Sequence, residues 1–476
     1  IGPKDSRYSC TRAAMQDRTH AALRFHLHGG STLMALAVAA AIAAATIGCS
    51  QEGPLTDQEM EQLRAFMLPA EGPPADTSNA FADNRAAAGL GKRLYFDGGY
   101  SGGLGPYNRK DVNGALGAQG DPGLVSCRSC HDPATGGADN RSKPNATSLG
   151  AGYTARNAPT VINAAYSPLW QFWDGRVDSL WSQALAPPEG GVECNSSRLE
   201  VVHFLYANYR SAFEEVFGAG ALPDLIASLP AAGKPGDQVF DELDSAPGGA
   251  KDVVNRAYAN FGKAIAAYER LLVSNNFEAS KFDRFMNGDK EAMSPAAIRG
   301  ARLFVGHAGC TECHRGPMFS DFSFHNVGAP QTGEYASPTD NGRFDGVTAL
   351  TSASNMYTRS SALYSDDTTS TTYLESLKGM PPAELKGQFK TPTLRNVAKT
   401  APYMHDGVYQ TLWDVVNHYN FGGASGQFAG DKDPSISPLM LTDAELADLV
   451  EFLRALDDGE TATMGDDLPG GLVGPP

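Results

Sequence analysis

Two short stretches of the sequence decide its fold: Cys127-Arg-Ser-Cys130-His131 and Cys310-Thr-Glu-Cys313-His314. Within each stretch the two thiols are three residues apart, so they lie on one turn and can reach both vinyl groups of a porphyrin. The adjacent histidine is then held below the iron as its proximal ligand. A zinc site with this spacing would need two further ligands nearby, and a thioredoxin-like motif would not require a histidine in both copies. The sequence therefore predicts two covalently bound haem c groups.

The segments that follow the two motifs resemble each other. Residues 159–181 begin Pro-Thr-Val-Ile-Asn-Ala-Ala and residues 392–413 begin Pro-Thr-Leu-Arg-Asn-Val-Ala; each then has an Asp-Gly pair followed by a Leu-Trp pair at the same spacing. Apolar residues recur every three or four positions between 253 and 273, and Thr442-x-x-Glu445 is a capping box ahead of another such repeat. Strands are not evident. We therefore expect a mostly α fold, with two cytochrome c-like haem domains related by an internal repeat and with long irregular loops.

These patterns divide the chain into five parts. The predicted parts are a signal or lipoprotein leader (1–49), a polar, Pro-rich tether (50–84), an N-terminal haem domain (85–290), a C-terminal haem domain (291–460) and a loose tail (461–476). Two polar insertions, at about 100–122 and 333–385, are expected to be surface loops.

The leader is predicted from an apolar run of fifteen residues, Leu33–Ile47, which follows several arginines. That length suits a signal peptide better than a membrane span of about 20 residues. The run ends Thr46-Ile-Gly-Cys49, which resembles a bacterial lipobox, although Thr46 stands where an aliphatic residue is usual. Lipidation of Cys49, plain secretory cleavage and an uncleaved anchor are all open. Each places the mature protein outside the cytoplasm, and we expect it in the periplasm.

The composition of the 476 residues excludes other classes of protein. Acidic residues number 54 against 38 Lys and Arg, and the net charge of −16 argues against a nucleic-acid partner. Four of the seven cysteines lie in the haem motifs, while Cys10, Cys49 and Cys194 stand apart, so the chain has no disulfide framework. The expected contact with a membrane is limited to a possible lipid on Cys49.

The chain resembles the bacterial dihaem cytochrome c peroxidases, and among them it is more similar to the MauG branch. The resemblance extends from about residue 85 to 456 and is specific because several motifs occur together. They are Leu90-Gly-Lys-Arg-Leu-Tyr-Phe96, Arg156-Asn-Ala-Pro-Thr160, Gln171-Phe-Trp-Asp-Gly-Arg176, Arg299-Gly300, Phe324-His-Asn326 and Phe389-Lys-Thr-Pro-Thr-Leu-Arg-Asn396. The resemblance implies that the N-terminal haem reacts with hydrogen peroxide and that the C-terminal haem transfers electrons.

The same resemblance implies roles for three residues around the N-terminal haem. Gln183 would be the distal glutamine, Glu193 the distal acid–base residue, and Trp173 the aromatic side chain between the haems. Peroxide cleavage needs a base that moves a proton from the near oxygen to the far one, and a carboxylate above an open iron can do this. The alternatives are a loop acid for Glu193, a solvated helix residue for Gln183 and core packing for Trp173.

The sixth ligands of the two haems separate the branches of this family. Peroxidases that need reductive activation carry a distal histidine just before Arg-Asn-Ala-Pro-Thr; here Ala151 takes that place, so we expect the first haem to be five-coordinate and open. For the second haem the resemblance implies Tyr419, as in the MauG branch, where other members have Met. A phenolate ligand would lower the reduction potential of that haem. The alternatives are His418, Met404 or a vacant position.

Two further features come from the resemblance. A calcium ion between the haems would be held by the side chain of Asn157 and the carbonyls of Thr400 and Pro402, with water completing an oxygen shell. Asn157 could instead cap the adjacent turn. The MauG enzyme oxidises its protein substrate through a surface Trp two residues before the second haem motif, and Ala308 occupies that place here. A large protein substrate is therefore not implied.

Three functions remain, and we expect the first. The chain is an exported peroxidase that reduces hydrogen peroxide at the N-terminal haem, with electrons from a small cytochrome c or cupredoxin that pass through the C-terminal haem. Alternatively it is a MauG-like oxidase of an aromatic side chain or small substrate, which uses a bis-high-valent state of the two haems. The third possibility is a dihaem electron carrier without catalytic activity.

Overall fold

The computed structural model describes residues 53–139, 141, 147–274, 280–352, 354–361, 363–367, 372–377 and 382–458. The predicted leader with Cys49 and the predicted tail lie outside the described residues. Within these ranges, no helix combines the length and the apolar character that crossing a bilayer requires.

Helices and short 3₁₀ turns make up nearly all the regular structure, which confirms the predicted mostly α fold with long irregular loops. The described residues contain one two-stranded antiparallel sheet, in which Phe324 pairs with Lys390 and His325 with Phe389. The elements are α2 (Asp57–Arg64), α3 (Arg85–Phe96), α4 (Cys127–Cys130), η1 (Pro133–Thr135), η2 (Ala164–Tyr166), α5 (Leu180–Gln183), α6 (Ala186–Glu189), α7 (Arg198–Asn208), α8 (Arg210–Phe217), η3 (Asp224–Ser228), α9 (Gln238–Asp241), α10 (Ala250–Glu269), α11 (Lys281–Met286), α12 (Pro295–Val305), η4 (Cys310–Glu312), β1 (Phe324–His325), α13 (Arg343–Leu350), α14 (Thr372–Leu377), η5 (Pro382–Leu385), β2 (Phe389–Lys390), η6 (Val397–Lys399), α15 (Leu412–Asn420) and α16 (Asp443–Arg454).

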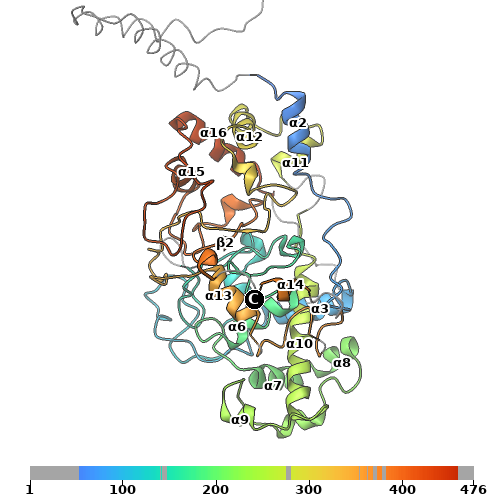
Figure 1. The fold of residues 1–476 in the computed structure, drawn as a ribbon. Helices are drawn as coiled ribbons and strands as arrows, with labels where there is room; N and C mark the ends of the chain where they lie inside the picture. Colours follow the sequence, from blue (N-terminus) through green and yellow to red (C-terminus); the bar gives the residue numbers. More distant parts are fainter. Residues whose placement is uncertain are drawn as a thin grey trace, which may run out of the picture.

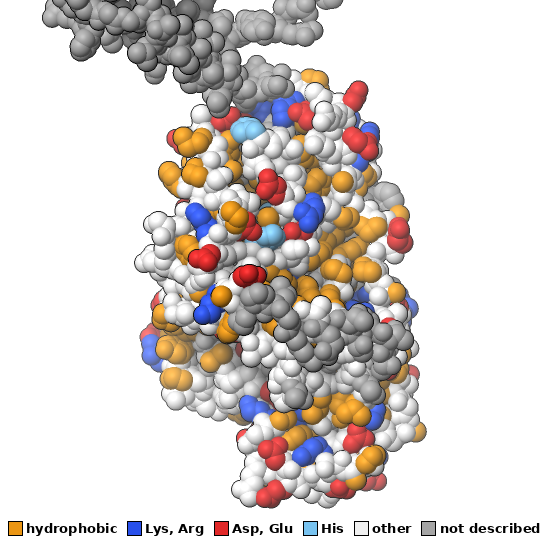
Figure 2. All heavy atoms as spheres, in the orientation of Figure 1, with side chains coloured by type: hydrophobic (Ala, Val, Ile, Leu, Met, Phe, Trp, Pro, Cys, Tyr) orange, Lys and Arg blue, Asp and Glu red, His pale blue; other side chains and the backbone are white. Residues whose placement is uncertain are grey.

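The molecule is elongated, with a helical group at each end and irregular chain between them. Figure 1 shows α12, α15 and α16 together with α2 and α11 at one end, and α7, α8, α9 and α10 at the other. On the face shown in Figure 2, acidic and basic side chains are interspersed. The excess of acidic residues therefore does not form one continuous patch on that face.

The core of the N-terminal domain is built where α3 crosses α10. A methyl group added at Gly91 of α3 would lie 1.9 Å from the carbonyl oxygen of Ala264 in α10, so only glycine allows the two backbones to approach this closely. The apolar face predicted between residues 253 and 273 is buried on α10, including Tyr258 and Phe261, which are both 0% exposed. The first haem motif packs against this crossing of α3 and α10.

The core of the C-terminal domain is built in a similar way, where α12 crosses α16. A methyl group at Gly300 would lie 2.0 Å from the carbonyl oxygen of Asp448. The predicted capping box is present, since Thr442 and Glu445 bond to each other's backbone at the start of α16. Both domains thus use a glycine where two helices cross next to a haem motif. The internal repeat itself stays a prediction.

Residues that we predicted to belong to a tether instead fold against the C-terminal domain. Helix α2 lies in this segment, and Leu63 and Phe66 are buried in the core formed by α12 and α16. Glu59 forms an ion pair of 2.9 Å with Arg302 of α12. The described part of the predicted tether is therefore not a solvated linker throughout, because burial of its few apolar side chains is favourable. The division of the chain into five parts stays a prediction.

The insertion at 333–385, expected to be a surface loop, bridges the two domains. Arg343 of α13 donates to the carbonyl oxygens of Asp174 (3.0 Å) and Gly175 (2.8 Å) in the N-terminal domain. Tyr357 and Tyr364 from the same insertion belong to the N-terminal hydrophobic core. The described part of the insertion therefore combines exposed residues with side chains that bond to or pack against the N-terminal domain.

Replacement of Arg395 tests how the C-terminal domain is held together. Its guanidinium is fully buried, pairs with Asp283 at 2.8 and 3.1 Å and donates to the carbonyl of Phe66 at 2.8 Å. Arg395→Met leaves a buried carboxylate unpaired, so we expect the free energy of unfolding to fall by about 3–5 kcal/mol. Urea unfolding of the dihaem protein, followed by circular dichroism, measures this. Arg454→Met, which breaks an exposed pair with Glu451, should cost about 1 kcal/mol or less; equal losses would contradict the interpretation.

Candidate functional site

The first Cys-x-x-Cys-His motif is held against the α3–α10 core. Cys127 and Cys130 are the two ends of α4, a single turn, so both thiols point from one short helix as thioether bonds to one porphyrin require. The phenol of Tyr95 donates to the carbonyl of His131, and the hydroxyl of Tyr100 lies 3.6 Å from the sulfur of Cys127. Buried tyrosines from the core therefore fix the backbone and the thiol of this motif.

Both proximal histidines are oriented by a backbone carbonyl. Nδ1 of His131 lies 3.3 Å from the carbonyl oxygen of Gly137, and Nδ1 of His314 lies 2.7 Å from that of Phe319. Burial lowers the pKa of both imidazoles, which favours the neutral form. A neutral imidazole that donates through Nδ1 keeps its Nε2 lone pair for a metal. The two histidines therefore have the tautomer that an iron ligand needs.

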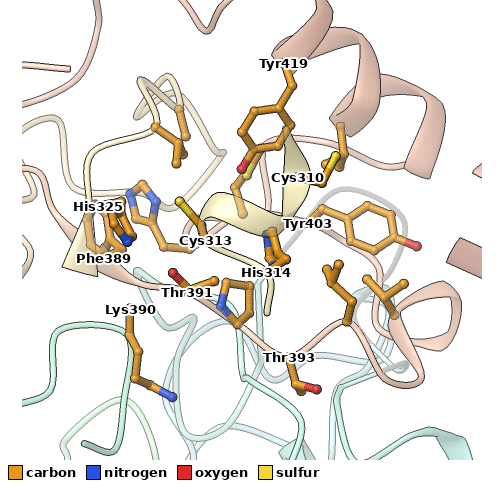
Figure 3. A pocket seen from close by; sticks show the side chains of 18 of the residues that line it. Cys310, Cys313, His314, His325, Phe389, Lys390, Thr391, Thr393, Tyr403 and Tyr419 are labelled. Carbon is orange, nitrogen blue, oxygen red and sulfur yellow. The ribbon is translucent and has the colours of Figure 1, made fainter. Parts of the chain in front are cut away.

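The second motif opens into a cavity of about 410 Å³. Cys310, Cys313, His314 and Tyr419 line it, and Figure 3 shows them around one space. Lys390 also lines the cavity, and burial lowers the pKa of its ammonium group to about 8. No carboxylate pairs with this ammonium among the described residues, whereas a haem carries two propionates that would. The thiols, the imidazole and the unpaired cation together fit a haem.

The placement of Tyr419 agrees with the predicted sixth ligand of the second haem. Tyr419 lies near the end of α15 and faces the two thiols of the motif, and burial raises the pKa of its phenol. His418 is not available, because its Nδ1 lies 2.9 Å from the hydroxyl of Tyr409 and its Nε2 lies 3.0 Å from the carbonyl of Val327. Met404 lines the same cavity. Tyr419 therefore stays the predicted ligand, with Met404 as the remaining protein alternative.

The predicted distal acid and the alanine in place of a distal histidine lie next to each other. A tight hairpin, in which Leu149 pairs with Tyr153, carries Ala151 at its tip. The backbone N–H of Ala151 donates to the carbonyl of Glu193 at 2.7 Å. Burial is the main cause of the raised pKa of the Cys130 thiol, and Glu193 lies close enough to add to it, so this tip is beside the first haem motif. Burial raises the pKa of the Glu193 carboxyl itself, and the nearby Arg176 opposes this shift.

In the part of the chain that the structure describes, two other residues near the predicted distal side, Gln183 and Cys194, have no polar contact that would define a catalytic role. Gln183 is the last residue of α5 and is half-buried, and its side chain makes no hydrogen bond to any other described residue. Cys194 is 4% exposed and lies near Cys127 and Cys130, and burial raises its pKa well above that of a free thiol. A thiol with so high a pKa stays protonated and is a poor nucleophile. Cys194 therefore acts as a small apolar residue of the N-terminal hydrophobic core.

Trp173 is held between the two domains. Its indole N–H donates to the carbonyl of Asn157 at 2.8 Å, and its own carbonyl accepts from the backbone N–H of Lys390 at 2.7 Å. The side chain lines the same cavity as Tyr419. Trp173 thus belongs by sequence to the N-terminal domain but borders the site of the C-terminal haem.

The predicted calcium ligands are also brought together. The side-chain amide of Asn157 bonds to the carbonyl of Pro402 at 2.5 Å, and its backbone N–H donates to the carbonyl of His405 at 2.7 Å. Thr400 lines the same cavity. The described residues contain no group of three or more acidic, His or Cys side chains arranged for a metal. A cation here would depend on amide and carbonyl oxygens alone.

Sequence reasoning assigned no role to Lys390 or Arg176, although both lie in motifs quoted above. Arg176 stacks on the ring of Phe172 at 3.6 Å and pairs with Asp174 at 3.2 Å, which places its charge toward Glu193. A cation that precedes Thr-Pro-Thr in a stretch without acidic neighbours was the available signal for Lys390. Neither could be assigned before the fold showed which carboxylates were within reach.

Comparison with known proteins shows relatives that are similar over most of the chain. A model of the di-haem cytochrome c peroxidase family matches residues 85–291. The cytochrome-c peroxidase IdrP1 of Denitromonas iodatirespirans is 34% identical over 452 residues, which cover 93% of this chain and 97% of the relative. The methylamine utilization protein MauG of Methylorubrum extorquens is 29% identical, and the match covers 87% of this chain and 90% of the relative.

Two solved structures are also similar to this chain. A MauG-like protein associated with microbial copper homeostasis is 26% identical, with a TM-score of 0.55, and the match covers 84% of this chain and 98% of that one. The diheme peroxidase BthA of Burkholderia thailandensis is 22% identical, with a TM-score of 0.58, over 86% of this chain and 99% of its own. This second likeness concerns the fold alone.

Proposed function

The chain belongs to the di-haem cytochrome c peroxidase family, and from that premise we propose that it reduces hydrogen peroxide at its N-terminal haem, with electrons that a small redox protein delivers through the C-terminal haem. Relatives in this family are named cytochrome c peroxidases, and the family is one of di-haem enzymes. The enzyme class and the two haems follow from membership. The roles of the two haems, the donor and the residues below are our proposal.

The observation that carries the proposal is the contact between Ala151 and Glu193. A haem iron with a free coordination position supplies peroxide binding and takes up the oxidising equivalents. Ala151 is 2% exposed and offers no side chain that could ligate a metal, so the hairpin tip leaves the distal side open. Glu193, bonded to that tip, takes the proton from the near oxygen of peroxide and returns it to the far oxygen. Its raised pKa favours this, because the carboxyl must both accept and release a proton near neutral pH.

Replacement of Glu193 by Gln tests this role. We expect Glu193→Gln to slow the reaction with peroxide by about 100- to 10,000-fold, because the amide cannot carry the proton. Stopped-flow measurement of the Soret band after mixing with peroxide gives the rate directly. Glu215→Gln, at an exposed position of α8, is the matched control and should react like the unaltered protein. An unchanged rate in Glu193→Gln would instead favour a dihaem electron carrier.

A second candidate function, oxidation of an aromatic side chain or small substrate as in MauG, rests on Tyr419. Its phenol lines the cavity and has no hydrogen-bond partner within the described part of the chain. Burial raises the pKa of this phenol, so the ionised form is costly without a partner. Coordination to iron would replace the proton and remove this cost. A phenolate ligand would lower the potential of the second haem and make loss of an electron from it easier.

Replacement of Tyr419 by Phe distinguishes the two functions. If Tyr419 is a ligand, Tyr419→Phe changes the absorption and EPR spectra of the second haem and raises its reduction potential. Tyr403→Phe is the matched control, because Tyr403 lines the same cavity while its hydroxyl points away from the thiols (Figure 3). A second-haem spectrum that is the same in Tyr419→Phe and in the unaltered protein would exclude the phenolate and with it the MauG-like function.

We also propose that the protein is exported and works in the periplasm, with a lipid on Cys49 as a possible anchor. Covalent attachment of haem c to two motifs and the apolar run at Leu33–Ile47 both support export. The electron donor is a small cytochrome c or cupredoxin. Nucleic acid is not a partner, given the net charge of −16.

A calcium ion between the haems is the last part of the proposal. Asn157, Thr400 and Pro402 supply the oxygens, after the Asn157 amide turns its oxygen toward the carbonyl of Pro402. We expect isothermal titration of chelator-treated dihaem protein with calcium to show one site, and Asn157→Ala to lose it. Asn195→Ala, which removes another side-chain amide that donates to a backbone carbonyl (Gly103, 2.8 Å), should keep it. Equal binding by the two variants would contradict these ligands.

A further inference from the structure

Three tyrosines from separate parts of the chain form a stack beside the distal hairpin. The rings of Tyr153 and Tyr335 are parallel within 10°, with centroids 3.8 Å apart, and Tyr107 meets them edge-on at 5.2 and 5.8 Å. Tyr107 comes from the first polar insertion, Tyr153 from the hairpin and Tyr335 from the second insertion. Both insertions thus converge on one point, and the peroxidase chemistry proposed above does not use it.

The tyrosine stack is connected rigidly to the distal pocket. Tyr153 is two residues from Ala151, so their Cα atoms are at most about 7 Å apart. The side chain of Asn108, which is 0% exposed, donates to the carbonyls of Gly150 and Ala151 at 3.0 and 3.1 Å. This contact fixes Tyr107, its chain neighbour, to the same hairpin tip that bonds to Glu193. One end of the stack therefore adjoins the proposed peroxide site.

The other end of the tyrosine stack reaches solvent. Tyr107 is 44% exposed, and Tyr153 and Tyr335 are both half-buried. Aromatic pairs that contribute only to packing usually adopt edge-to-face or offset geometry with centroids 4.5–7 Å apart. The close parallel pair gives strong overlap of the two π systems, and one exposed and two half-buried phenols contribute less to stability than buried Phe rings would. The geometry suits movement of an electron between the pocket and the surface.

A proton acceptor is present where oxidation of tyrosine needs one. Glu334 precedes Tyr335 in the chain, and both its carboxylate and the phenol of Tyr153 lie near enough to act on the pKa of the Tyr335 phenol. Burial and the neighbouring carboxylate raise the pKa of the Tyr335 phenol, so it is protonated at neutral pH and must release a proton when it loses an electron. The exposed carboxylate of Glu334 can take that proton and return it.

We infer that the tyrosine stack is a second route for electrons, through which small phenolic reductants are oxidised at the surface of the N-terminal domain. The inference rests on the proposed reaction of peroxide at the first haem. An electron passes from Tyr335 through Tyr153 to the oxidised haem site, and the phenolic proton moves to Glu334, which leaves a neutral tyrosyl radical. A phenol in solution then gives up one electron to this radical and its own proton to water, while Glu334 returns the proton to Tyr335. Two phenols are oxidised for each peroxide reduced to two waters.

The reductants that use this route need not enter the distal pocket. The hairpin is bonded along its tip to the segment that carries Glu193, through Ala151 to Glu193 and Gly152 to Val192 at 2.7 and 2.9 Å. Ala151 is buried under this contact. A phenol in solution would therefore meet the exposed Tyr107 and its stacked neighbours before the buried tip of the hairpin.

The test uses the dihaem protein, hydrogen peroxide, a nitroso spin trap and 4-methoxyphenol as the reductant. We expect peroxide to give a trapped radical that peptide mass spectrometry places on the tyrosine stack, and to drive oxidation of the phenol. Tyr335→Phe and Tyr153→Phe keep the stacked ring but not the phenolic proton, so both signals should be lost while the Soret change with peroxide keeps its rate. Glu334→Gln should also lose them. Tyr206→Phe, which removes another phenol bonded to a carboxylate (Asp224, 3.0 Å), should keep both.

The possible results separate this inference from the proposed function. If peroxide causes no Soret change, the proposed function is wrong and the inference is wrong with it. If the Soret band changes but the radical and the phenol oxidation persist in Tyr335→Phe and Tyr153→Phe, the inference alone is overturned. Loss of the radical in these variants but not in Tyr206→Phe supports it.

Discussion

The guanidinium of Arg156 lies between carboxylates that belong to the two domains. It bonds to Asp174, in the loop that carries Trp173, and donates twice to Asp340, in the insertion of the C-terminal domain, at 2.7 Å each. Arg156 is 19% exposed and the two carboxylates are 5% and 9% exposed, so water screens these attractions little. Bidentate geometry adds a fixed direction to the attraction. Because Asn157 follows Arg156 in the chain, this cluster also fixes the segments that lie between the two predicted haem sites.

Trp173 shows what the cluster achieves. The loop that presents it is bonded to Arg156 through Asp174, its indole is bonded to the carbonyl of Asn157, and its own carbonyl is bonded to the backbone of Lys390. The indole is thus bonded to its own domain, and the backbone of Trp173 is bonded to the C-terminal domain. Transfer of an electron between two fixed groups depends on separation and orientation. Bonds to both domains at this residue suit the bridging role that we propose for Trp173.

The sequence alone was sufficient for the features that depend on local spacing. The two haem motifs, the capping box of α16 and the buried face of α10 need only neighbours along the chain, and all were predicted correctly. The contacts of helix α2 and of the second insertion could not be predicted, because their partners lie far away in the chain, as for Leu63 in the C-terminal core and for Glu59 with Arg302. Likewise, His418 could be dismissed as a ligand only when both its ring nitrogens were seen to be occupied. Long-range pairing leaves no periodic signal in a sequence.

The two haem sites share their proximal design and differ on the opposite side. Each predicted proximal imidazole donates to a backbone carbonyl, so the proximal sides alone do not account for the different roles that we propose for the two haems. The proposed difference comes from what the chain places near each motif: Ala151 with Glu193 in one case, and Tyr419 in the other. A site that is open to peroxide collects oxidising equivalents whether or not an electron donor is bound. The two insertions bring Tyr107 and Tyr335 onto Tyr153 of the hairpin that contacts Glu193, so in the proposed mechanism the same segments offer those equivalents a route to the surface.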